Sequence, residues 1–504
     1  MHAPKVMVIA VDGAEKSLLH EWAQAGVLPN LRALLERATR CNVENPSGLF
    51  SGSLWPSFYT GVSPGRHGRY CSSQLKAGTY EFARVHGFDS KLDTFWSVLS
   101  GHGRKVAVID APKTALEEQL NGVQITDWAT EDLGRPVGSY PPGLASEVSG
   151  GYQRPPSLEN ALSSRDEVGF RALREQLIRS AHMKGRMSAT ILDRNRGDLF
   201  FTVFGEAHVA GHLCWHFHDP SHPDHDPSLV DRVGDIVRDV YVAIDEALVP
   251  LLERASPDTH VILYSNNGMG ANYSGNFILD EVLLARDKMR LSAGRRVLAG
   301  ATDALERVTP GFIHRRVAPI YGGLRQGMGL PLREFRHRTC FRTRSNEIAG
   351  GVRINLKGRE PEGVVDPAAY DALCRSLKQD LESLTNTSTG EPIVRRVIVT
   401  RELYVGDYVD RFPDLLVEWT EAEPIEGATS SATGTVRKYH AGHRTGDHRP
   451  DGWLIVSGPS SSPGVVDPVS IYDLAPTVTG LLGVPFRQAE GTDVSAHVGL
   501  SSSP

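Results

Sequence analysis

Residues 47–68 read SGLFSGSLWPSFYTGVSPGRHG and combine small hydroxyl residues, a short apolar run and a closing turn rich in glycine and proline. The apolar run from Trp55 to Tyr59 predicts a helix that begins close to the serines. The first turn of a helix has unpaired backbone N–H groups and the positive end of the helix dipole, which favour an anion. A serine there could attack a phosphate or sulfate ester, although a serine before a helix is also the ordinary N-cap residue.

The apolar run Val6–Val11 is followed at once by Asp12 and Gly13. A continuous apolar run of this length is typical of a central parallel strand, and Asp12 would follow its carboxyl end. Open α/β sheets bind their ligands at that edge, so Asp12 is a candidate site residue. Taken alone, an Asp-Gly pair is also a common turn.

Strands and helices alternate through most of the chain. We predict strands at 105–110, 199–204 and 260–265, long helices at 165–194 and 227–253, and a loop at 134–156. Strands separated by helices of this length indicate an α/β fold, in which a mostly parallel central sheet has helices on both faces.

From residue 278 to residue 400 the pattern is less regular and rich in arginine. We therefore expect a core in two parts, an inserted cap region between them and a short disordered tail. The expected boundaries are 1–277 and 401–500 for the core, 278–400 for the insertion and 501–504 for the tail. The core is expected to return with a strand near 413–419.

The composition sets few limits on the partners of the chain. Its 504 residues are 40% hydrophobic and 23% charged, which suits a large globular core. The net charge of −6 does not indicate the basic surface that nucleic-acid binding requires. No apolar run approaches the roughly 20 residues that cross a bilayer. The five scattered cysteines favour a reduced compartment, and the run at Val6 is too short for a signal peptide, so we expect a cytoplasmic protein.

A group of histidines follows the strand predicted at 199–204. His208 and His212 are four residues apart, which places both imidazoles on one face of a helix, within reach of one zinc or manganese ion. A solvated loop rich in histidine would have the same composition.

These motifs together resemble the alkaline phosphatase superfamily, in particular its type I phosphodiesterase/nucleotide pyrophosphatase-like family. The resemblance rests on Ser51-x-x-x-Trp55-x-Ser57-Phe58-x-Thr60-Gly61, on Pro64-Gly65-Arg66-His67-Gly68 and on the strand before Asp12. It implies an alkaline phosphatase-like fold, a nucleophilic Ser51 and a metal-binding Asp12. Ser53, two residues later, is the alternative nucleophile.

In this family one metal is bound by an Asp-x-x-Gly-His motif and a late histidine. His212 matches the histidine of the motif, His208 stands in place of its aspartate, and Glu206 lies close enough in the sequence to restore the negative charge. For the late histidine we choose His448 over His440 and His443, because His448 lies shortly before a glycine and a strand. The resemblance thus implies a divalent ion, zinc or manganese, on His208, His212 and His448.

The second metal site departs from the family pattern. Where the family has Ser-Asp-His-Gly-Met, this chain has Asn266 and Asn267 between Ser265 and Gly268. Amide oxygens are weak ligands for zinc, so we expect one or two ions in all, with the second held poorly if at all. The asparagines are then either remnants of a metal site or ligands of the substrate. Without a second ion, Ser51 needs another activator, for which Asp12 and a nearby histidine are candidates.

The resemblance implies a metal-dependent phosphohydrolase, similar to a phosphodiesterase or nucleotide pyrophosphatase, that acts on a small phosphoester or similar anionic ester. The asparagines leave a second reading open, a pseudo-hydrolase that binds an anion without turnover. The same fold also hosts sulfatases, phosphonate hydrolases and group transferases. A sulfatase is disfavoured because the chain has no Cys-x-Pro-x-Arg or Ser-x-Pro-x-Arg motif.

Overall fold

Strand β1 (Val6–Val11) lies in the interior of the main sheet, as its continuous apolar sequence predicts. It pairs in parallel with β8 (Leu199–Phe204) on one side and with β9 (His260–Ser265) on the other. Every residue of the three strands is buried, as expected where helices cover both faces of a parallel sheet. The observed bounds of these strands agree with the predicted ones.

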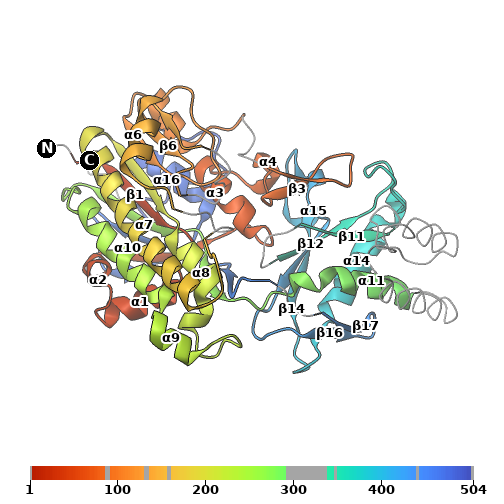
Figure 1. Cartoon of the computed structure of the whole chain (residues 1–504). Coiled ribbons are helices and arrows are strands. Elements are labelled where there is room, and N and C mark those ends of the chain that lie inside the picture. Colours follow the sequence, from red (N-terminus) through yellow and green to blue (C-terminus); the bar gives the residue numbers. More distant parts are fainter. Residues whose placement is uncertain are drawn as a thin grey trace. The chain divides into compact units, whose positions relative to one another are not determined.

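The computed structural model of the 504-residue chain describes residues 3–85, 91–129, 136–155, 161–290, 338–344, 349–438 and 442–500 (Figure 1). The chain divides into two compact units. The core unit consists of residues 1–69, 86–272 and 443–504, and the second unit consists of residues 70–85 and 273–442.

The main sheet belongs to the core unit and is mostly parallel. Within the described residues it has ten strands in the order β20-β2-β19-β9-β1-β8-β5-β6-β7, with β21 beside β2. The strands not yet given are β2 (Thr39–Glu44), β5 (Val106–Ile109), β6 (Gly122–Thr126), β7 (Gly138–Tyr140), β19 (Gly452–Ser457), β20 (Gly464–Val465) and β21 (Val469–Ser470). β1, β5, β6, β8 and β9 run parallel, whereas β19 is antiparallel to both its neighbours. The predicted α/β class is confirmed.

Helices cover both faces of this sheet. The helices of the core unit, within the described residues, are α1 (Lys16–Gln24), α2 (Pro29–Leu35), α3 (Phe50–Thr60), α4 (Pro64–His67), α5 (Phe95–Gly101), α6 (Gly143–Gly151), α7 (Glu167–Arg194), α8 (Glu206–His218), α9 (Pro227–Val233), α10 (Ile236–Leu252) and α16 (Leu474–Leu481). In β8, Phe201 packs against Phe58 of α3 and Trp96 of α5, whereas the hydroxyl of Thr202 is 3.1 Å from that of Ser188 in α7. Adjacent side chains of a strand point to opposite faces, so α3 and α5 lie on one face and α7 lies on the other. Figure 1 shows α10 beside α7.

β1, β8 and β9 end in register at one edge of the sheet. The residues that follow these strands, among them Asp12, Glu206 and Asn266, therefore lie at the same edge, where open α/β sheets bind their ligands. No helix in the described part of the chain combines the length and the apolar character needed to span a bilayer.

The second unit has its own antiparallel sheet, with the strand order β11-β12-β15-β14. The elements of this unit are β3 (Ser73–Leu75), β4 (Phe82–Arg84), α11 (Leu279–Met289), β11 (Cys340–Thr343), β12 (Ala349–Ile354), α14 (Tyr370–Glu382), β13 (Thr385–Asn386), β14 (Val394–Val399), α15 (Thr400–Leu403), β15 (Leu415–Trp419), β16 (Gly427–Ser430) and β17 (Gly434–Arg437). Its core includes apolar side chains of α11, α14 and the four-stranded sheet.

The boundaries of this unit differ from the expected insertion at 278–400. The unit extends to residue 442, and β15, which was expected to begin the return of the core, lies in its sheet instead. A buried apolar strand has the same sequence pattern in either sheet, so periodicity could not assign it. Residues 291–337 of the expected insertion and the tail at 501–504 lie outside the described residues.

Two further segments of the core unit differ from the prediction. The expected loop at 134–156 contains β7 and α6, and the helix expected at 227–253 is divided into α9 and α10. Gly234, between the two helices, has a φ angle of 97°, a left-handed backbone that interrupts a right-handed helix.

Candidate metal centre and nucleophile

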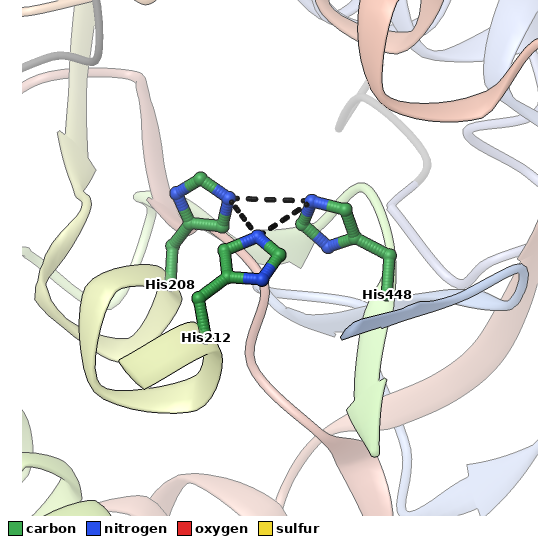
Figure 2. A group of neighbouring side chains, drawn as sticks. All are labelled: His208, His212 and His448. Atoms are coloured by element: carbon green, nitrogen blue, oxygen red, sulfur yellow. Dashed lines mark hydrogen bonds between the residues drawn. The ribbon is translucent and has the colours of Figure 1, made fainter. Parts of the chain in front are cut away.

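Three imidazoles from two elements of the core unit meet at one point. His208 and His212 lie one turn apart on α8, and His448 lies on β18 (Gly446–Arg449). The Nε2 atoms are 3.0 Å apart in His208 and His212, 3.2 Å apart in His208 and His448, and 3.3 Å apart in His212 and His448. Figure 2 shows the three Nε2 atoms facing one another. All three side chains are buried.

Glycines allow α8 and β18 to approach so closely. A Cβ atom at Gly446 would lie 2.1 Å from the carbonyl oxygen of Gly211, far inside any real contact distance. Because residue 446 is a glycine, Nδ1 of His212 can lie 2.9 Å from its carbonyl oxygen. β18 is also fixed on its other side, since it pairs antiparallel with β10 (Gly268–Ala271), which follows β9.

The contact with Gly446 determines which nitrogen of His212 carries the proton. A carbonyl oxygen can only accept, so Nδ1 donates, and the neutral ring has its lone pair on Nε2, toward the other two rings. Burial, together with Arg444 and the other two histidines, lowers the pKa of His212 well below its usual value, so the ring is neutral at pH 7. A neutral imidazole with a backbone partner on Nδ1 is the form that binds metals through Nε2.

The spacing of the three nitrogens fits a single ion. Zinc binds histidine nitrogen at about 2.0–2.1 Å, and tetrahedral angles then separate the nitrogens by about 3.4 Å. The observed separations of 3.0–3.3 Å are close to that value. In the part of the chain that the structure describes, this is the one cluster of three or more histidine, cysteine or acidic side chains arranged to hold a metal. Three neutral nitrogens suit zinc better than manganese, which prefers oxygen.

Asp12 lies beside this cluster, near the other nitrogen of His208. Its Oδ2 is 3.9 Å from Nδ1 of His208, and the carboxylate is not part of the group of facing Nε2 atoms. At 3.9 Å the carboxylate is beyond hydrogen-bond distance of this nitrogen and places negative charge beside the ring of His208. Asp12 also affects Tyr59 of α3. Burial raises the pKa of Tyr59 well above its usual value, and the negative charge of Asp12 raises it further.

Ser51 lies in the first turn of α3. It is partly exposed, whereas residues 52–60 of the helix are buried, Ser53 completely. A substrate therefore has better access to Ser51 than to Ser53. One turn later, Trp55 packs edge to face on Tyr264 of β9 at 6.1 Å between ring centroids, which fixes α3 against the strand that leads to Asn266.

Asn266 and Asn267 are 2% and 1% exposed. The backbone carbonyl of Asn266 accepts a hydrogen bond of 2.5 Å from Nδ2 of Asn45. Among the described residues, neither the side-chain oxygen of Asn266 nor either polar side-chain atom of Asn267 has a hydrogen-bond partner. Each unsatisfied buried amide costs about 1–3 kcal/mol, so these side chains are suited to meet polar groups of a ligand.

Comparison with known proteins identifies the family of this chain. The profile of the family described as type I phosphodiesterase / nucleotide pyrophosphatase matches residues 6–423. The chain belongs to this family. Membership in the type I phosphodiesterase family confirms the expected enzyme class, hydrolases that act on phosphoric esters. No relative was found among curated protein sequences.

Solved structures share the fold of this phosphodiesterase family member. Two of them are phosphonoacetate hydrolase from Sinorhizobium meliloti 1021, in complex with phosphonoacetate and with phosphonoformate, with TM-scores of 0.53 and 0.50. Both are 13% identical in sequence, and each match covers 95% of this chain and 96% of the other. The likeness confirms the alkaline phosphatase-like fold.

The structure of this family member does not bring Glu206 together with the three histidines. Oε1 of Glu206 accepts a hydrogen bond of 2.5 Å from the hydroxyl of Ser180 in α7, and burial raises the pKa of Glu206. Of the two alternatives to His448, His443 is exposed and lies outside the cluster, and His440 lies outside the described residues.

This phosphodiesterase fold also contains a buried contact between a serine and a histidine, Ser57 and His67, which has a structural role. Nε2 of His67 lies 3.0 Å from the hydroxyl of Ser57, and both side chains are buried. The backbone N–H of Arg69 donates to Nδ1 of His67 at 3.1 Å, so Nε2 carries the proton and donates to Ser57. His67 therefore cannot act as a base toward Ser57.

Sequence reasoning missed one charged neighbour of the predicted nucleophile. Nζ of Lys113 donates a hydrogen bond of 2.8 Å to the backbone carbonyl of Ser51. Lys113 follows β5 much as Asp12 follows β1, and this position after a parallel strand was the signal that could have found it.

Proposed function

We propose that this member of the type I phosphodiesterase family is a metal-dependent phosphohydrolase with Ser51 as its nucleophile. The observation that carries the proposal is the cluster of His208, His212 and His448, in which three buried Nε2 atoms lie within 3.0–3.3 Å of one another. Three lone-pair nitrogens have little reason to meet at one point in a protein interior unless they share a cation.

The three histidines would hold one divalent ion, for which zinc is the first candidate and manganese the second. When bound, such an ion supplies Lewis acidity to phosphoryl oxygens. Asp12 would place negative charge beside His208, on the Nδ1 side. For the second ion expected for this family, the chain offers Asp12 and the neutral amides of Asn266 and Asn267. One carboxylate is too little to hold an ion tightly, so we propose that this chain holds one ion and that the two amides bind the substrate.

In the proposed reaction the hydroxyl oxygen of Ser51 attacks phosphorus. A Ser51 Oγ–P bond forms, the bond from phosphorus to the leaving oxygen breaks, and the hydroxyl proton passes to the carboxylate of Asp12. Asp12 then passes this proton to the leaving oxygen. In the second half of the reaction the carboxylate of Asp12 takes a proton from the water that attacks phosphorus, the Ser51 Oγ–P bond breaks, and the proton returns to Oγ as the product is released. The N–H groups of the first turn of α3 would favour the anionic group at Ser51.

The substrate class follows from the family. A phosphodiester or a nucleotide-like pyrophosphate is the first expectation, and a phosphonate is the second, because the named structural neighbours are hydrolases of phosphonoacetate. A different function, anion binding without turnover, is favoured only by the replacement of acidic ligands with Asn266 and Asn267.

The test combines metal analysis with one matched pair of variants. We expect one equivalent of zinc or manganese per chain after purification without chelator, and hydrolysis of an aryl phosphodiester that Ser51→Ala abolishes. Ser53→Ala, two residues away, serves as the control and should retain turnover. Full activity in Ser51→Ala would exclude the proposed nucleophile. Tight anion binding with no product, at any added divalent ion, would support the binding function instead.

A further inference from the structure

The loop after β5 has an unusual backbone. Asp110 and Lys113 both have a φ angle of 60°, in the left-handed region that residues other than glycine rarely adopt. Such strained residues persist only where the surroundings hold them in place, and they are concentrated at functional sites.

Three sets of contacts hold this loop. The carboxylate of Asp110 accepts hydrogen bonds of 2.8 Å from the backbone N–H groups of Trp128 and Ala129 and forms an ion pair with Lys184, a side chain that is completely buried. Nζ of Lys184 also lies 4.8 Å from the ring centroid of Trp128. On the other side, the hydroxyl of Tyr59 in α3 donates to the carbonyl of Pro112 at 3.0 Å. The loop is therefore tied both to α7 and to α3.

Lys113, the fourth residue after β5, reaches the predicted nucleophile. The ammonium group of Lys113 donates to the carbonyl oxygen of Ser51 at 2.8 Å, in the first turn of α3. A positive charge is thus fixed to the residue that bears the reacting hydroxyl. Asn266 and Asn267, which lie at the same edge of the sheet, contribute no charge.

We propose that Lys113 is a positioning and charge-compensating residue for Ser51, and that its ammonium group supplies positive charge in place of the second ion that the proposed function leaves out. The inference rests on the proposed function of Ser51. As the Ser51 Oγ–P bond forms and the bond to the leaving oxygen breaks, negative charge develops beside the fixed ammonium group, which stabilises it without reorganisation. Lys113 keeps its proton throughout, because the proton of Ser51 passes to Asp12.

The test removes and then restores the charge. In Lys113→Met we expect kcat for an aryl phosphodiester to fall by about 100-fold, with a much smaller change in KM, as for other preorganised charges that act in the transition state. Lys113→Arg should retain more activity than Lys113→Met. In Lys113→Ala, added ethylammonium should raise kcat in a saturable way, which a purely structural residue would not permit. Bound metal and melting temperature should stay as in the wild type.

The control is Lys5→Met. Lys5 precedes β1 at the opposite edge of the sheet, is 62% exposed at its side chain and pairs with Asp198 at 3.2 Å, so kcat should not change. A folded Lys113→Met with wild-type kcat, or a Lys113→Ala that ethylammonium does not accelerate, would overturn the role of Lys113. If Ser51→Ala is inactive in the same assay, the proposed function survives that result. If Ser51→Ala is active, both proposals fail together.

Discussion

Two histidines of the core unit, His212 and His67, are held neutral by burial but use opposite ring nitrogens. Nδ1 of His212 donates to a carbonyl group, which leaves the Nε2 lone pair for a ligand. Nδ1 of His67 accepts from a backbone N–H group, which leaves Nε2–H to donate to Ser57. One backbone partner thus decides whether a buried imidazole can bind a metal or only support the fold.

His67 gives the protein a predictable sensitivity to acid. Burial, followed by the charge of Arg69, lowers the pKa of His67 to about 3, whereas an unfolded chain has a value of about 6.5. Between these values the unfolded chain binds a proton that the folded chain does not. The free energy of unfolding should therefore decrease as the pH falls, by up to about 1.4 kcal/mol per pH unit from this group.

Urea denaturation at several pH values between 7.5 and 4 tests this with His67→Gln, which keeps a donor for Ser57. The variant should be less stable at neutral pH but should lose stability more slowly on acidification. The exposed His102→Gln serves as the control and should keep the wild-type slope. An unchanged slope in His67→Gln would show that other groups cause the acid sensitivity.

At the scale of elements, the cluster of His208, His212 and His448 depends on how closely α8 approaches β18. In Gly446→Ala the new Cβ atom would meet the carbonyl oxygen of Gly211 at 2.1 Å, so the two backbones must separate. We expect a loss of about 1–3 kcal/mol of stability. The hydrogen bond to His212 should weaken, and metal affinity should fall with it, because an outer partner orients the ligand ring.

Metal titration of the two proteins, followed by calorimetry, measures this effect. Gly464→Ala is a matched control, since Gly464 also lies on a strand of the core unit and a Cβ atom there would meet nothing within 4 Å. The control should bind metal as the wild type does. Wild-type affinity in Gly446→Ala would mean that the close approach is unimportant for the cluster.

The elements also show which parts of the structure the sequence could predict. β8 and β9 were predicted with their observed bounds, because each contains a short run rich in apolar and β-branched or aromatic residues that is too short for a helix. The spacing of four residues was enough to predict that His208 and His212 lie on one face of a helix, which is α8. The break at Gly234 and the membership of β15 in the second unit depend on long-range packing, which local patterns do not contain. The place of Lys113 after β5 could be predicted from the sequence, but its contact with Ser51 could not, since that contact spans 62 positions of the chain.

At the scale of the whole molecule, metal binding should stabilise the core unit, to which all three histidines belong. A ligand that binds only the folded state adds about 2.7 kcal/mol when its free concentration is 100 times the dissociation constant. We therefore expect zinc to raise the temperature of an unfolding transition and a chelator to lower it. Scanning calorimetry with and without metal measures the shift.

The shift should disappear in His212→Ala and persist in His182→Ala. His182 is a suitable control because its side chain is 33% exposed and pairs with Glu246 at the surface. A shift of the same size in His212→Ala would place the bound metal elsewhere.

The order of strands in the main sheet has a consequence for biosynthesis. β2, formed by residues 39–44, pairs with β19, β20 and β21, which all come from beyond residue 451, and His448 follows His208 by 240 positions. A ribosome that adds 5–20 residues per second needs roughly 20–80 s to make the intervening 400 residues. During that time β2 of the nascent chain has no strand to pair with, and after its own synthesis neither does the edge of β9 that β19 later covers, which leaves both open to aggregation or to a chaperone. The proposed metal site is therefore complete only after residue 448 has been made.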